Sequence, residues 1–67
     1  MEFYQQRVVV EKQGLDEKID RLIAFMGARA FSGLTEAEQD RLRRQLGAMS
    51  EYSAILGERI SCFPAEG

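Results

Sequence analysis

The chain has 67 residues, of which 45% are hydrophobic and 30% are charged, and its formal net charge is −2 at pH 7. A chain of this length folds as one domain, here residues 1–67, and its core is so thin that disulfides, a metal or association with other chains usually add stability. One cysteine and no histidine exclude an internal disulfide and a Cys/His zinc site, and the acidic balance disfavours non-specific nucleic-acid binding.

The first predicted helix covers about residues 3–27. Its apolar residues recur at the spacing of a helix with one buried face, and they are Val8, Leu15, Ile19, Leu22 and Met26, widened by Ile23 and Phe25. This apolar stripe is interrupted halfway, where Glu11 and Lys12 stand in place of a hydrophobe. Gly27 is the expected stop, because glycine is a poor helix former.

A connection over residues 28–34, with the letters ARAFSGL, leads to a second predicted helix over about residues 35–61. Thr35 and Glu38 form the pattern of a capping box, in which each side chain bonds the backbone N–H of the other residue. Seven residues of this helix then follow one another at alternating intervals of four and three, which is typical of a coiled-coil seam. They are Leu42, Leu46, Met49, Ser53, Leu56, Ile60 and Phe63. The helix is about 40 Å long at about 1.5 Å per residue, and a short frayed tail is expected after it.

Two long helices with a short connection lie antiparallel, so the predicted fold class is all-α, a two-helix antiparallel hairpin. Assembly of such hairpins into a homo-oligomeric helical bundle is the remaining source of stability. The expected facing pairs are Leu22 with Leu42, Leu15 with Met49, and Val8 with Leu56. The same register places Glu11 and Lys12 at the level of Ser53, so both seams lose their hydrophobe at one layer.

Two interpretations of this polar layer stay open. Polar residues at a seam position cost stability and select one alignment or one oligomeric state, so the layer can be a registry device. Alternatively, it borders a wet ligand pocket.

Polar and aromatic residues gather beyond this layer, toward the open end of the hairpin. Arginine offers forked donors for phosphate, tyrosine offers a ring for a base, and glutamine can read a base edge. The candidate ligand-binding residues are therefore Tyr4, Gln5, Gln6, Arg7, Lys12, Tyr52 and Arg59. The competing interpretation is that Tyr52 flanks the core, Arg59 pairs with Glu11 or Glu58, and the glutamines are solvated surface.

Neither catalysis nor membrane insertion is expected. The chain lacks a histidine base and a Gly-rich phosphate loop, Cys62 has no evident partner, and the carboxylates alternate with Lys and Arg along helix faces. The longest uncharged run, Leu22 to Ala28, is too short to cross a bilayer, and the N-terminus does not resemble a signal peptide. An enzyme is therefore not expected, no cofactor is expected, and the cytoplasm is the expected compartment.

The strings QQRVVVEKQGLDEKIDRLIAFM and EAEQDRLRRQLGAMSEYSAILGERI, with the spacing between them, resemble a family of small phage-encoded proteins often described only as hypothetical or crAssphage-related. The resemblance covers nearly the whole chain. The matching positions are Gln5, Gln6, Arg7, Glu11, Lys12, Leu15, Lys18, Phe25, Gln45, Met49, Tyr52, Leu56, Arg59 and Ile60. The chain departs from that pattern at Gly14, Gly47 and Gly57, where ordinary helix formers would be expected.

Small phage proteins built from helical hairpins include sponges, which bind the cyclic nucleotide messengers of bacterial immune systems such as CBASS and Thoeris and withhold them from their effectors. The resemblance thus implies a phage counter-defence protein that binds a messenger between subunits without cleaving it. In that role Arg7 and Arg59 hold phosphates, Tyr52 or Tyr4 stacks a base, and the remaining contacts come from Gln5, Gln6 and Lys12. A coiled-coil adaptor for a host or phage protein is the alternative, and a DNA-directed role is less expected.

Overall fold

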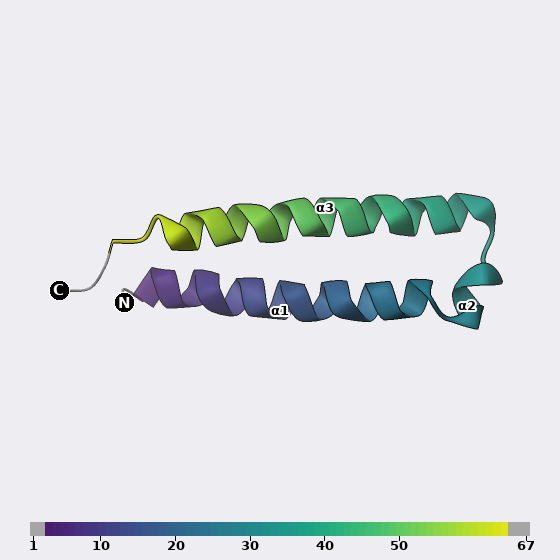
Figure 1. Cartoon of the computed structure of the whole chain (residues 1–67), viewed down its shortest axis with the longest axis horizontal. Helices are drawn as coiled ribbons and strands as arrows, with labels where there is room; N and C mark the ends of the chain where they lie inside the picture. Colours follow the sequence, from purple (N-terminus) through teal and green to yellow (C-terminus); the bar gives the residue numbers. More distant parts are fainter. Residues whose placement is uncertain (1–2, 65–67) are drawn as a thin grey trace.

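The computed structural model describes residues 3–64, which form three helices: α1 (Phe3–Met26), α2 (Arg29–Ser32) and α3 (Glu36–Ser61). The expected all-α class is confirmed for this part of the chain. The two long helices lie side by side and run in opposite directions, and α2 occupies the corner between them (Figure 1). The open end therefore holds the start of α1 and the end of α3.

The molecule is a rod, with extents of 53 × 15 × 14 Å and a radius of gyration of 15.5 Å. A compact domain of this length would have a radius of gyration of about 11 Å. In a two-helix rod each helix covers only one face of the other, so most side chains stay in contact with solvent.

The hydrophobic core is correspondingly small. Among the described residues, three hydrophobic side chains are buried: Val8 is 7% exposed, Phe31 is 8% exposed and Leu56 is 0% exposed. Val8 and Leu56, which the register predicts to face each other, are both buried, and the other apolar seam residues remain half-buried. Large hydrophobic side chains also lie outside the seam, and Phe3 and Val10 are 74% and 64% exposed.

The connection contains a helix, although it was predicted as an irregular loop. Phe31 of α2 packs edge-on against Phe25 of α1 with ring centroids 6.1 Å apart, and the Arg43 guanidinium lies 5.5 Å from the centre of the Phe31 ring. The Gln39 side-chain amide donates to the carbonyls of Phe31 and Leu34, at 3.0 and 3.1 Å. These contacts close the corner, and a four-residue helix is too short to give a periodic sequence signal.

The start of α3 carries half of the expected capping box. The Thr35 hydroxyl accepts the backbone N–H of Glu38 at 3.2 Å, and Thr35 itself is extended, as an N-cap residue should be. The Glu38 carboxylate does not accept the backbone N–H of Thr35, which would complete the box. It accepts a hydrogen bond from the Arg41 guanidinium at 2.8 Å. An arginine one turn further along the helix thus competes successfully for the carboxylate.

Replacing Gly14 or Gly47 with alanine is expected to raise the free energy of unfolding. No atom lies within 4 Å of a Cβ added at either glycine. Glycine costs up to about 1 kcal/mol relative to alanine inside a helix, so each substitution should add about 0.5–1 kcal/mol, measured by urea denaturation. At Gly57 the added Cβ would lie 3.2 Å from Lys12 Cε, so the gain there should be smaller. A stability loss at Gly14 or Gly47 would contradict this and place a second chain against the glycine.

Candidate functional site

The polar layer is a closed hydrogen-bond network between the two long helices. The Lys12 ammonium donates to Asp16 Oδ2 and to Ser53 Oγ, at 2.9 Å each. The Ser53 hydroxyl in turn donates to Asp16 Oδ1. Ser53 is only 7% exposed, and its hydroxyl is satisfied on both sides. The layer is therefore internally paired, at the level that the register predicts.

Gly57 makes room for this network. It lies one helical turn after Ser53, and a Cβ at this position would lie 3.2 Å from Lys12 Cε, closer than most side-chain contacts. The aliphatic part of Lys12 therefore crosses α3 over Gly57 before its ammonium reaches Ser53. An unexpected glycine in the second helix is thus explained by the packing of a lysine from the first.

The pKa of Asp16 is lowered from its ordinary value of 3.8, first by the hydrogen bond from Ser53, then by the bond from Lys12, while partial burial acts in the opposite direction. The folded chain therefore binds this proton less readily than the unfolded chain. Stability from Asp16 is fully present above pH 3.8 and is lost as the pH falls through the lower folded pKa.

The variant Asp16→Asn should lose this part of the acid dependence. We expect its thermal unfolding midpoint to fall less steeply than that of the wild type as the pH is lowered below 3.8. Asp20→Asn, at an exposed position on the same helix, is the matched control. The midpoint is measured by circular dichroism. If it falls equally steeply with pH in the wild type and in Asp16→Asn, Asp16 does not cause this part of the acid dependence.

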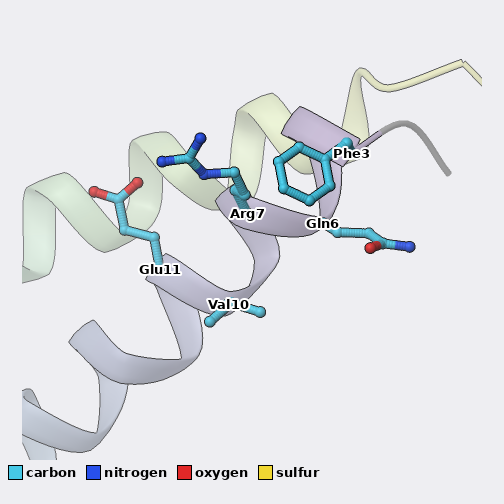
Figure 2. Close-up of a pocket in the computed structure, with 5 residues that line it drawn as sticks. All are labelled: Phe3, Gln6, Arg7, Val10 and Glu11. Carbon is cyan, nitrogen blue, oxygen red and sulfur yellow. The ribbon is translucent and has the colours of Figure 1, made fainter.

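A groove with a volume of about 430 Å³ lies at the open end, along residues 3–11 of α1. Phe3, Arg7 and Glu11 follow one another at intervals of four residues, so they form a row along the helix, and Gln6 and Val10 form the adjacent row. Arg7 and Glu11 extend to the same side of α1, with Phe3 beside Arg7 (Figure 2). All five lining residues come from one helix.

The charges of this groove are not paired with each other. The Arg7 guanidinium lies 5.8 Å from the centre of the Phe3 ring, and within residues 3–64 it forms no ion pair. The Glu11 carboxylate accepts a hydrogen bond from the Tyr52 hydroxyl of α3, which ties the groove to the second helix. A guanidinium beside an aromatic ring is a suitable contact for an anionic group carried by a flat ligand.

The sequence-predicted residues divide into three groups. Gln6 and Arg7 line the groove, and Tyr52 reaches it through Glu11. Tyr4 and Arg59 are exposed outside it, where the Tyr4 ring packs edge-on against Phe63 with centroids 6.0 Å apart. Gln5 and Lys12 lie at the interface between the helices, with Gln5 only 2% exposed. The structure therefore does not gather all the candidates on one surface.

Three groove residues were not among the predicted ligand-binding residues: Phe3, Val10 and Glu11. A signal for two of them was available, because Phe3 and Val10 are separated by two helical turns and lie off the main apolar stripe. Exposed apolar residues away from the main stripe mark a helix face that another partner can cover.

Two classes of site find no support in the described part of the chain. No helix within residues 3–64 combines the length and apolar character needed to span a membrane. The same residues contain no cluster of three or more His, Cys, Asp or Glu side chains arranged to hold a metal ion.

Comparison with known proteins identifies the family. No curated protein and no solved structure is significantly similar to the chain. A family model does match, over residues 2–62, which include α1, α2, α3 and the whole of the groove. That model describes the family called Sequestin, and the chain belongs to it.

Proposed function

We propose that this protein sequesters a cyclic nucleotide immune messenger, without cleaving it, and so acts as a phage counter-defence protein in the cytoplasm of the host bacterium. The observation that carries the proposal is the groove at the open end, where the Arg7 guanidinium lies against the Phe3 ring and forms no ion pair within residues 3–64. The family name supports the general role, since Sequestin denotes a protein that sequesters.

The groove offers the contacts that a cyclic nucleotide requires. Arg7 can donate two parallel hydrogen bonds to a phosphate, and no carboxylate within residues 3–64 occupies it. Phe3 and Tyr52 are 74% and 43% exposed, so the ring of each can stack on a base. Gln6 adds an amide that can donate and accept.

A second copy of the chain would complete the site. Ligand sites typically bury 70–90% of a small molecule, whereas this groove is lined by α1 alone and is open on its outer side. The exposed hydrophobic residues Val10 and Ile55 give a second chain apolar surface to cover. On this proposal the homo-oligomer stabilises a thin core and encloses the ligand, and Arg59, exposed on α3, is available to a neighbouring subunit.

Binding without turnover agrees with the residues present. The chain contains no histidine and a single cysteine, Cys62, which is exposed near the end of α3. Phosphodiester cleavage would need a general base or an activated nucleophile close to the phosphate. The groove contributes one carboxylate, Glu11, and one of its two oxygens accepts a hydrogen bond from Tyr52.

Native mass spectrometry of the purified protein tests this function. The protein is measured alone and with cyclic dinucleotides, cyclic trinucleotides and cyclic ADP-ribose isomers, so that one spectrum reports both subunit number and ligand mass. We expect an oligomer that retains an intact messenger at a fixed stoichiometry. An oligomer that stays empty across the panel would overturn the proposal and favour the coiled-coil adaptor.

The adaptor remains the second candidate because of one observation. The paired network of Lys12, Asp16 and Ser53 satisfies its own polar groups, which is how a registry device behaves. An adaptor would use an exposed helix face, such as the one containing Ile23, which is 53% exposed, to hold a partner protein.

A further inference from the structure

We propose that the polar layer of Lys12, Asp16 and Ser53 fixes the register of the two long helices, so that α1 and α3 pair in one alignment only. The layer serves this purpose whatever the protein binds, so the inference is independent of the groove and of the proposed function. A polar layer in a seam costs stability relative to an apolar one, and what it contributes is the selection of one arrangement.

The apolar layers alone do not define the register. Both seams repeat every seven residues, so a slip of one heptad, about 10 Å along the axis, again brings apolar residues opposite each other. A slip in one direction places Leu15 opposite Leu56, and a slip in the other direction places it opposite Leu42. These two slipped registers are therefore the arrangements that the sequence has to exclude.

Lys12 is the residue that distinguishes the three registers. In the observed register its ammonium donates to Ser53 Oγ of α3 and to Asp16 Oδ2 of its own helix, at 2.9 Å each. One heptad away in either direction, Lys12 lies opposite Ile60 or Leu46, and neither side chain accepts a hydrogen bond. A half-buried ammonium that loses an acceptor is costly, so both slips are disfavoured.

Gly57 adds a second selection, by shape. A Cβ at this position would lie 3.2 Å from Lys12 Cε, so the lysine crosses α3 at a residue that has no side chain. In the slipped registers the corresponding residue is Ser50 or Pro64, and each of these carries a Cβ. Charge and shape therefore favour the same alignment.

The connection between the helices is long enough to permit a slip. Residues 27–35 can span up to about 30 Å when extended, which is about three times the shift of one heptad. A slip would break the contacts of Phe31 and Gln39 at the corner. Those contacts lie about four helical turns from Ser53, so the layer acts on the half of the hairpin that the corner does not reach.

The variant Lys12→Met tests the inference, because methionine is also long and unbranched, and it keeps the packing over Gly57 while removing the charge. Spin labels are attached to cysteines introduced by Asp20→Cys in α1 and Glu58→Cys in α3, in a Cys62→Ser background. The labelled chains are diluted with unlabelled protein, so that double electron–electron resonance reports the distance within one chain. Both labelled positions are exposed, and they lie far apart along the axis. A slip therefore changes their distance by up to about 10 Å.

We expect one narrow distance in the labelled chain that keeps Lys12. In Lys12→Met we expect a second distance, shifted by up to about 10 Å, and a thermal unfolding midpoint no lower than that of the wild type. Lys18→Met is the matched control, because it makes the same change at an exposed position of the same helix. It should keep the single distance.

A single distance in Lys12→Met would overturn the inference and assign the register to the corner around Phe31. Two distances in the chain that keeps Lys12 would overturn it as well. Unfolding of Lys12→Met, seen as loss of its helical circular dichroism, would show that the layer supplies stability, which also contradicts the inference. None of these results bears on the proposed function, since every distance is measured without a ligand.

Discussion

Replacing Leu56 with alanine should unfold the protein or reduce its stability to a small remainder. Leu56 is 0% exposed and is the one fully buried large side chain among the described residues. A buried Leu→Ala substitution typically costs about 2–5 kcal/mol. A domain of this length has a total free energy of unfolding of roughly 3–10 kcal/mol, so this one side chain accounts for a large share.

Urea denaturation followed by circular dichroism measures this loss directly. Ile55→Ala is the matched control, because the neighbouring residue is 43% exposed and its truncation leaves no closed cavity. We expect Ile55→Ala to cost less than half as much as Leu56→Ala. Equal losses in the two variants would mean that Ile55 is as well covered as Leu56, as it would be if a second subunit packs over it.

On the proposed function, replacing Arg7 with alanine should weaken messenger binding strongly while leaving the assembly intact. The Arg7 guanidinium is exposed and contributes to no described ion pair, so its removal should change the fold little. Hydrogen bonds to a charged group are worth about 1.5–3 kcal/mol, which corresponds to a loss of affinity of roughly tenfold to 150-fold. Titration calorimetry gives the affinity, and native mass spectrometry gives the subunit number.

Arg21→Ala supplies the control for Arg7→Ala. Arg21 is exposed on the same helix, about 21 Å from Arg7 along the helix axis. The control should bind the messenger as the wild type does. If both variants weaken binding equally, only the general positive charge of α1 matters, and the groove is not the site. An adaptor would instead keep its protein partner in both variants.

The spacing of the seams was sufficient to predict the all-α class and the pairing of the two long helices. The α1 seam in fact runs without a break in steps of three and four, since Gln5 and Lys12 occupy regular positions beside Val8 and Leu15. The interruption is one of polarity only. This explains why Gln5 is 2% exposed, although it was grouped with its chain neighbours Tyr4 and Gln6 as a ligand contact.

Side-chain partners were harder to predict than the helices. Nothing in the spacing indicates that Asp16 joins Lys12 and Ser53, because Asp16 follows the seam residue Leu15 in the chain and reaches the layer with its side-chain carboxylate. Gln39 closes the corner by reaching carbonyls that belong to a four-residue helix. The groove depends on exposed residues, for which the burial pattern carries no information.

All the residues that line the groove come from α1, and this affects how the protein can evolve. Phe3, Gln6 and Val10 are exposed and make no contribution to the buried core around Leu56. Changes at these positions can therefore alter what is bound at little cost in stability. If the protein sequesters a messenger as proposed, these three positions can change with the ligand, whereas Glu11 is constrained by its contact with Tyr52.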